Sequence, residues 1–327
     1  MVRIYPIPTF RPSFQPTDLS NLIFWGRDNV VTPNAIAGSI ATFHITWGGG
    51  GYSPGDVCSL TYGDATMRVL TVGGSGEVLT AETVFPGTLY WANPAGNYQP
   101  MLIGGSGYAR IAVDTVTQVA GEQTITNWLD GGPAGNNFVP INFYFPEIWY
   151  PNALSGFGGI RMGYHSSQSG IRKSFAPALV RPLAVFFIIS WYGSTYHTRM
   201  FNGKHTYPVI EVNTSGGKWN LRDGISMPND QISTTVPVNT TPGVFQLFAF
   251  NAKGPGVASW FIANNSAKFE KVICSDMPWG IDMLQIGGHE GGGGRNQCFV
   301  HELIVCGNPT TNEENNCLTY LRNKFSI

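Results

Sequence analysis

The amino-acid sequence predicts an all-β protein, and its composition carries that prediction. Only 12% of the 327 residues are charged, against about 25% in an average soluble domain. Glycine accounts for 41 residues and aromatic side chains for 13% of the chain. Exposed helix faces need Glu, Lys, Arg and Ala, whereas strands and turns favour aromatic residues, Thr, Val and Gly. The composition therefore favours strands joined by turns, and the low charge indicates that partners cover part of the surface.

Most segments show the alternation of apolar and polar residues that is typical of strands. A buried strand is expected within residues 19–28, and the longest apolar run, Leu183–Trp191, also has the length of a strand. One helix is predicted over residues 310–325, because Thr310 or Thr311 can cap it. Its apolar face, at helical spacing, comprises Cys317, Leu318, Leu321 and Phe325.

Three regions differ in character. Residues 1–17 form an extended arm, since its four prolines exclude a helix or a central strand. Residues 37–125 are rich in Gly, Thr and Val and form an inserted β-rich module, while residues 18–36 and 126–327 form one larger domain. The arm either wraps its own domain or docks on a neighbouring protein through its large apolar side chains, Ile4, Tyr5, Ile7, Phe10 and Phe14.

Charge and cysteine usage exclude several classes of protein. The net charge is −1 without a basic run, which argues against nucleic-acid binding. No stretch of 18 apolar residues could span a membrane, and the N-terminus lacks the apolar core of a signal peptide. Five cysteines without a CxxC motif indicate reduced thiols and folding in a cytoplasm. Cys298 and Cys306, eight residues apart in one strand pattern, are expected on one face of that strand, too far apart to bridge.

Seven motifs in order resemble the concanavalin A-like, LamG-type jelly roll of bacterial surface and phage proteins. That resemblance implies a jelly-roll sandwich with a C-terminal helix, but it implies no particular function, because lectins, glycanases and adhesins share the fold. The motifs are Pro16–Trp25, Trp128–Asn137, Pro146–Met162, Arg181–Trp191, Leu284–Gly288, Phe299–Cys306, and Thr311–Glu314 with Tyr320–Phe325.

About 100 residues separate the first two motifs, so the intervening module looks like an insertion into a loop of the jelly roll. The module resembles short β-repeats of phage tail and fibre proteins, on the residues Gly51–Val57, Leu60, Gly63, Val69, Val72, Gly76 and Val78. The two resemblances together imply a bacteriophage protein made in the host cytoplasm and placed on the virion surface. They imply other virion proteins as partners and a homo-oligomer, with a trimer as the first expectation.

No catalytic constellation and no metal site is predicted. The paired carboxylates of a glycanase on this fold, in an E-x-D-x-E strand, do not occur. The segment His301–Val305 begins like a zinc-protease helix, but residue 305 is valine and the segment has a strand pattern. In a strand, His301 and Glu302 would point to opposite faces. No cofactor is expected, and the sequence leaves open a structural calcium ion held by scattered oxygen ligands.

Glycan contact is the remaining chemistry, because sugar sites pair an aromatic face with polar side chains. The surface candidates are Tyr196, His197, Trp219, Asn220 and His289, although large rings in a sandwich more often belong to its core. The leading hypothesis is a virion surface protein, either a capsid decoration, a short fibre or a tail adhesin. The alternatives are a free carbohydrate-binding lectin and, less favoured, a glycoside hydrolase.

Overall fold

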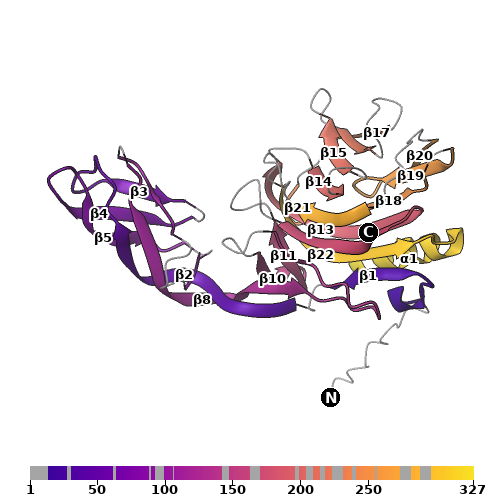
Figure 1. Cartoon of the computed structure of the whole chain (residues 1–327), viewed down its shortest axis with the longest axis horizontal. Helices are drawn as coiled ribbons and strands as arrows, with labels where there is room; N and C mark the ends of the chain where they lie inside the picture. Colours follow the sequence, from indigo (N-terminus) through magenta and orange to yellow (C-terminus); the bar gives the residue numbers. More distant parts are fainter. Residues whose placement is uncertain are drawn as a thin grey trace, which may run out of the picture.

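The structure is a computed structural model, and it confirms an all-β fold with one C-terminal helix (Figure 1). The residues that it describes are 14–27, 31–61, 64–87, 90–92, 99–105, 107–141, 147–162, 170–195, 199–203, 209–213, 218–222, 231–237, 241–254, 256–272, 281–287 and 296–327. The described part contains no helix that is both long and apolar enough to cross a membrane.

The larger sheet of the sandwich has eleven strands: β1 (Leu22–Gly26), β2 (Val31–Trp47), β6 (Tyr90–Trp91), β8 (Arg110–Trp128), β10 (Ile148–Leu154), β11 (Phe157–Met162), β13 (Leu183–Thr195), β18 (Phe245–Ala252), β19 (Ala258–Ile262), β20 (Phe269–Val272) and β22 (Asn296–Gly307). Ten of them follow the order β20-β19-β18-β13-β22-β11-β10-β8-β2-β6, and β1 pairs with β22. The 3₁₀ turn η1 (Pro16–Asp18) precedes β1.

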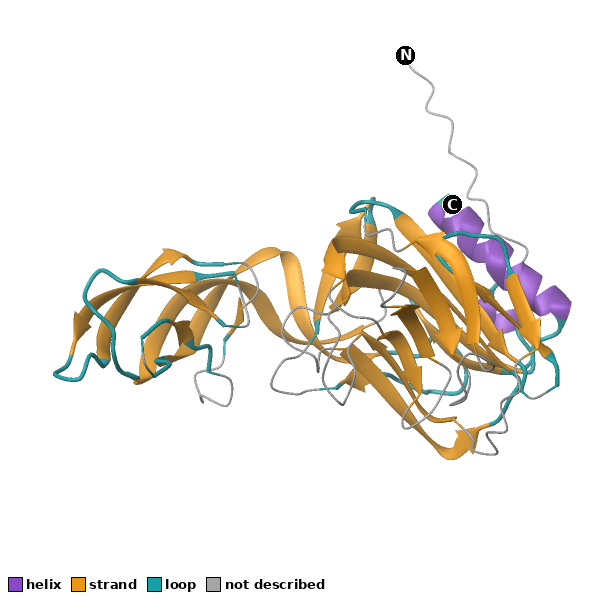
Figure 2. Cartoon of the chain, turned by 90° about the horizontal axis from the view of Figure 1, so that it is seen from above, coloured by secondary structure: helices purple, strands orange, loops and turns teal. Residues whose placement is uncertain are grey.

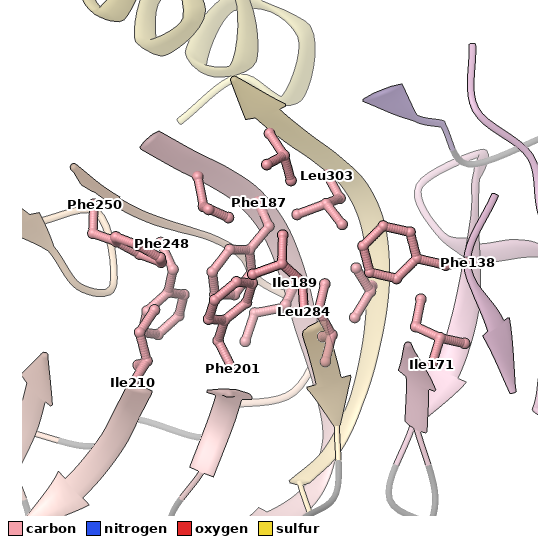
Figure 3. Packing of buried hydrophobic residues seen from close by; sticks show 14 of the residues in the cluster. Phe138, Ile171, Phe187, Ile189, Phe201, Ile210, Phe248, Phe250, Leu284 and Leu303 are labelled. Carbon is pink, nitrogen blue, oxygen red and sulfur yellow. The ribbon is translucent and has the colours of Figure 1, made fainter. Parts of the chain in front are cut away.

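The facing sheet has seven strands in the order β17-β16-β15-β14-β21-β12-β9. These are β9 (Val139–Pro140), β12 (Gly170–Leu179), β14 (Arg199–Gly203), β15 (Val209–Asn213), β16 (Lys218–Arg222), β17 (Gln231–Pro237) and β21 (Ile281–Gly287). Aromatic rings from both sheets meet in the core (Figure 3), where Phe187 of β13 stacks on Phe248 and on Phe201 at centroid distances of 5.5 and 6.3 Å.

A second apolar layer lies on the other side of the eleven-stranded sheet, under the helix α1 (Thr311–Phe325). The predicted apolar face is confirmed, since Cys317, Leu318, Leu321 and Phe325 are all buried there. Of the two predicted caps, Thr310 is the one that caps the helix, and it forms a capping box with Glu313. The helix therefore closes one side of the sandwich and shields the large sheet from water.

The long strands β2 and β8 pair with each other and leave the sandwich as a two-stranded ribbon (Figure 2). Beyond the sandwich they pack against a four-stranded sheet of order β5-β4-β3-β7, made of β3 (Val57–Leu60), β4 (Thr66–Val72), β5 (Val78–Phe85) and β7 (Leu102–Ile103). The two layers enclose a separate small core around Tyr52, Met67 and Ile111. We call this part the module.

The loop that carries the motif Trp128–Asn137 closes the free edge of β1. Asp130 accepts hydrogen bonds from the backbone N–H groups of Trp25, Gly132 and Asn136, and the Asn136 amide donates to the Ile23 carbonyl. A carboxylate at this point satisfies donors that an edge strand would otherwise leave unpaired. The motif therefore fixes the first strand of the sandwich to the segment that follows the module.

A β-bulge in β22 corrects two sequence predictions. The pairing of β22 with β13 passes from Glu302 directly to Val300, so His301 is the extra residue. His301 and Glu302 consequently both face α1, where they contact Phe325 and Lys324, and the prediction of opposite faces is wrong. Alternation with period 2 holds only while a strand is regular.

The bulge also separates two cysteines that were expected on one face. Cys298 lies in the core between the sheets, whereas Cys306 lies under α1. Both are free thiols, as are Cys58 and Cys317, while Cys274 lies outside the described residues. Burial raises the pKa of the Cys306 thiol well above its ordinary value, so this group stays protonated and unreactive.

The predicted boundaries of the module, 36/37 and 125/126, fall inside the strands β2 and β8. The strand pairing indicates a different pair of positions at which the module can be removed. Gly38 and Gln118 are direct partners across the ribbon, while Gln123 and Thr124 of β8 pair with β10 of the sandwich. We expect that replacing residues 39–117 by an Asn-Gly turn leaves the sandwich with its unfolding free energy within about 1 kcal/mol, because short turns connect such partners.

Urea unfolding followed by circular dichroism measures this. Removing residues 38–124 serves as the control and should destabilise the sandwich, since it deletes the β8 residues that pair with β10. Loss of cooperative unfolding in the 39–117 variant would show that the module and the sandwich do not fold separately.

Candidate interaction surfaces

Two of the five predicted glycan residues are buried, which corrects their placement at the surface. Trp219 has no exposed area and packs in the core against Phe248 and Trp191, at centroid distances of 4.9 and 6.3 Å. Asn220 is only 2% exposed. The large ring occupies the core because two packed sheets need bulky apolar side chains between them. Tyr196, His197 and His289 lie outside the described residues.

The Asn220 side chain belongs to a polar layer on the outer side of the seven-stranded sheet. Alternation along β16 points Leu221 into the core and Asn220 away from it, beside Ser233 of β17. Gln285 of β21 lies opposite Arg172 of β12 and has no exposed area. The oxygen of the Asn220 amide is buried without a hydrogen-bond partner. Because these amides have almost no exposed area, they offer no open surface to a ligand.

A buried cluster that the sequence did not reveal surrounds Arg161 of β11. Its guanidinium donates to the Tyr150 hydroxyl at 3.0 Å and lies 4.3 Å from the centre of the Tyr192 ring. Nearby, burial raises the pKa of Glu147 to about 8. The hydrogen bond that Glu147 accepts from the Gly170 N–H and the attraction of Arg161 lower this pKa, but by less than burial raises it. The sequence signal that could have indicated a buried acid here is Glu147 itself, because it stands within the apolar run FYFPEIWY.

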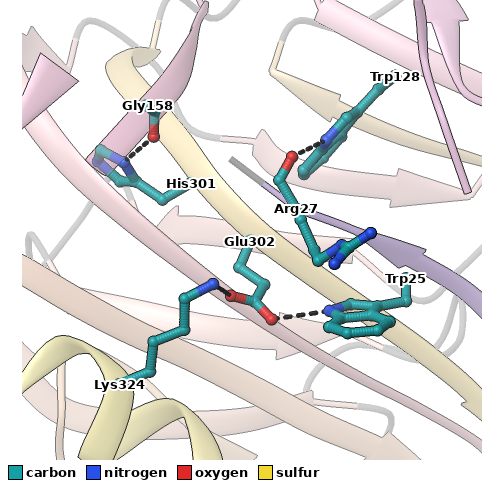
Figure 4. A network of polar contacts seen from close by, with 7 residues as sticks. All are labelled: Trp25, Arg27, Trp128, Gly158, His301, Glu302 and Lys324. Atoms are coloured by element: carbon teal, nitrogen blue, oxygen red, sulfur yellow. Dashed lines mark hydrogen bonds and ion pairs between the residues drawn. The ribbon is translucent and has the colours of Figure 1, made fainter. Parts of the chain in front are cut away.

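The segment that begins like a zinc motif forms a structural network instead (Figure 4). His301 lies 2.6 Å from the Gly158 carbonyl and 2.7 Å from the Ser190 hydroxyl. Glu302 has no exposed area, accepts from the Trp25 indole at 2.8 Å and pairs with Lys324 at 2.6 Å. Within the described ranges, no three His, Cys, Asp or Glu side chains are grouped to hold a metal ion.

Exposed apolar side chains are concentrated on the module. Among the described residues, twelve large apolar side chains are exposed, and the four on the sandwich are all valines. The eight on the module include the only aromatic ones of that set: Trp47, Val57, Leu70, Leu79, Val84, Phe85, Ile103 and Tyr108. Such a concentration on a small module is typical of a surface that contacts another molecule.

Strand register places several of these residues on the outer face of the four-stranded sheet. One row across the four strands runs Phe85, Thr66, Ser59 and Ile103, with Phe85 and Ile103 each about half exposed. The next row brings Val57 beside an ion pair between Arg68 and Glu82, whose atoms lie 2.7 Å apart. We call this surface the assembly face. It is apolar at its edges and electrically neutral at its centre.

One residue of the predicted docking arm lies within the described part. Phe14 packs at the edge of the apolar layer under α1, with its ring 6.4 Å from that of Tyr320. This residue therefore contacts its own sandwich. Ile4, Tyr5, Ile7 and Phe10 lie outside the described residues.

Comparison with known proteins gives low similarity. No family model matches the chain, and no curated protein matches it. Domain 4 of AbnA, an extracellular arabinanase from Geobacillus stearothermophilus, is 16% identical, with a TM-score of 0.38 over 53% of this chain and 80% of that one. The receptor-binding domain of botulinum neurotoxin D is 11% identical, with a TM-score of 0.41 over 58% of this chain and 48% of that one.

The binding domain of Paraclostridial Mosquitocidal Protein 1 is 12% identical, with a TM-score of 0.42 over 58% of this chain and 48% of that one. The chain thus spans about half the length of the two toxin domains that it matches. TM-scores below 0.5 do not establish a common function. The chain itself is an all-β sandwich with a module carried on two of its strands.

Proposed function

We propose that this protein is a non-catalytic assembly protein of a bacteriophage virion surface, and that it contacts neighbouring proteins through the assembly face. The observation that carries the proposal is the concentration of exposed apolar side chains on the module. The virion context is supported by the sequence resemblance to jelly-roll and tail-fibre repeats of phages. Synthesis in the host cytoplasm fits the free, buried thiols of the described cysteines.

The physical argument is the cost of leaving apolar area in water, about 25 cal/mol per Å². Phe85, Ile103 and Val57 are 47, 53 and 57% exposed on one sheet face. Because Arg68 and Glu82 already neutralise each other, a partner can cover this face without leaving an unpaired charge. Apolar side chains thus flank a neutral ion pair, which suits an interface because interfaces carry few charged residues at their core.

The architecture supports the same role. The ribbon of β2 and β8 holds the module away from the sandwich, so the two parts present different surfaces (Figure 1). A sandwich with one surface set and a module with another can link two neighbours in a particle. A homotrimer remains our proposal for the oligomer, from the resemblance to fibre proteins.

Replacing Phe85 and Ile103 together by lysine should lower incorporation into phage particles by about tenfold or more, the effect expected when two large apolar interface anchors are removed. Two buried charges would oppose docking, while the fold is retained because both side chains are half exposed. Quantitative immunoblots of purified particles give the readout, and circular dichroism confirms folding. The control is Val180→Lys, since Val180 is 75% exposed on the sandwich.

Normal incorporation of the double variant would refute the assembly face. A further variant without residues 2–13 tests the arm, because it keeps Phe14 and its contact with Tyr320. The alternative function is a free lectin. A free lectin would be absent from purified particles in its native form, so none of the variants would change the particle content.

A further inference from the structure

The module has a second outer face of different chemistry, on the ribbon strands β2 and β8. Phe43 and Ile45 of β2 point into the module core with Val113 of β8, so the residues between them point outward. A register shift after Ile45 pairs Trp47 with Arg110 on the outer face, where Trp47 is 52% exposed and the Arg110 guanidinium lies 5.5 Å from the centre of its ring. This geometry holds a flat indole at the surface in one orientation.

Polar pairs continue this face along the ribbon. His44 Nδ1 lies 2.8 Å from an Asp114 carboxylate oxygen, and their side chains are 51 and 32% exposed. The Thr42 and Thr115 hydroxyls lie 2.6 Å apart and are exposed. At about 3.3 Å per strand residue, Thr42 to Trp47 spans about 17 Å. The array is thus linear and longer than one small ring.

We infer that this array binds a neutral oligosaccharide, with one sugar ring against the Trp47 indole and neighbouring hydroxyl groups on the His44–Asp114 and Thr42–Thr115 pairs. Sugars offer an apolar C–H face to an aromatic ring and many hydroxyl groups to polar side chains. Each polar pair fixes its members in position and leaves further hydrogen-bonding capacity for a ligand.

Charge selects the class of ligand. Arg110 and Asp114 supply one positive and one negative side chain, so the array does not favour a phosphate or a uronic acid. The array also lacks the exposed aliphatic side chains that mark the assembly face, Val57 and Ile103, which argues for a sugar rather than a protein. The two faces of the module therefore take different partners, and the sugar site does not depend on the assembly function.

The test uses the full-length protein, fluorescently labelled, on immobilised oligosaccharides of bacterial cell-surface polysaccharides, with neutral and uronic-acid-containing sets side by side. We expect retention on at least one neutral oligosaccharide. Trp47→Ala should lower the affinity by about tenfold or more, as removing an aromatic anchor does. His44→Ala should weaken binding as well, and it keeps the test valid if the Trp47 variant misfolds.

Leu70→Ala is the matched control, because Leu70 is 42% exposed on β4, which pairs with neither β2 nor β8, and should not alter sugar binding. Cooperative melting of each variant confirms that it is folded. The inference is overturned if the native protein binds no neutral oligosaccharide or only acidic ones. It is also overturned if folded Trp47 and His44 variants bind as the native protein does.

Discussion

Replacing Lys324 by methionine should lower the unfolding free energy by about 3–5 kcal/mol, because it leaves a buried carboxylate without its cation. Glu302 has no exposed area, and the Lys324 ammonium lies 2.6 Å from one of its oxygens. The Trp25 indole, at 2.8 Å, would then be the remaining donor in this network (Figure 4). One neutral hydrogen bond does not compensate for the desolvation of a carboxylate. Urea denaturation at neutral pH measures the loss.

The double variant Lys324→Met with Glu302→Gln should recover most of this stability, since a neutral amide can still accept from the indole. Lys268→Met is the matched control. Its partner Glu314 is also buried, but the ammonium is 3.6 Å away and the carboxylate also accepts from Asn251 and Trp260. A loss in Lys324→Met no larger than in Lys268→Met would contradict the assigned role of the ion pair.

This network shows what the sequence could and could not predict. The strand at Leu183–Trp191 and the helix near residues 310–325 follow from local patterns, and the structure has both, as β13 and α1. Glu302 faces α1 by regular alternation with Ile304 and Cys306, whereas His301 faces it only because of the bulge. Local alternation carries no signal for such an irregularity, because a bulge is set by pairing with a distant strand.

The sequence was equally unable to predict which residues lie at the candidate surfaces. Trp219 and Trp47 both stand in strands, yet one is in the sandwich core and the other is half exposed. Composition alone does not distinguish them, since burial depends on which sheet face the partner layer covers. The sequence also did not predict how far β2 and β8 extend. Each strand contributes to both the sandwich and the module, so its pattern shows no break at the boundary between them. The sequence therefore predicted the layers better than the surfaces.

The buried Glu147 carboxyl predicts that the unfolding free energy depends on pH. Burial, the largest effect, raises its pKa from an ordinary 4.5 to about 8 in the folded protein. Between these values the folded state keeps the proton and the unfolded state loses it, so stability falls as pH rises. Below pH 4.5 both states are protonated and the effect vanishes. Burial also raises the pKa of the neighbouring Tyr192 and Cys298, so neither group titrates in this window.

Glu147→Gln should therefore become progressively more stable than the native protein between pH 5 and pH 8, by about 1.4 kcal/mol per pH unit at most. The amide oxygen can still accept from the Gly170 N–H, so the substitution removes the titration and retains the bond. Glu147→Met should show the same pH profile at lower stability throughout, because it leaves that N–H unpaired. Urea unfolding at several pH values gives the curves. Other groups that titrate in this range are present in all three proteins and cancel in the differences. Parallel curves for the native protein and Glu147→Gln from pH 5 to pH 8 would show that the Glu147 carboxyl is ionised without cost in the folded state.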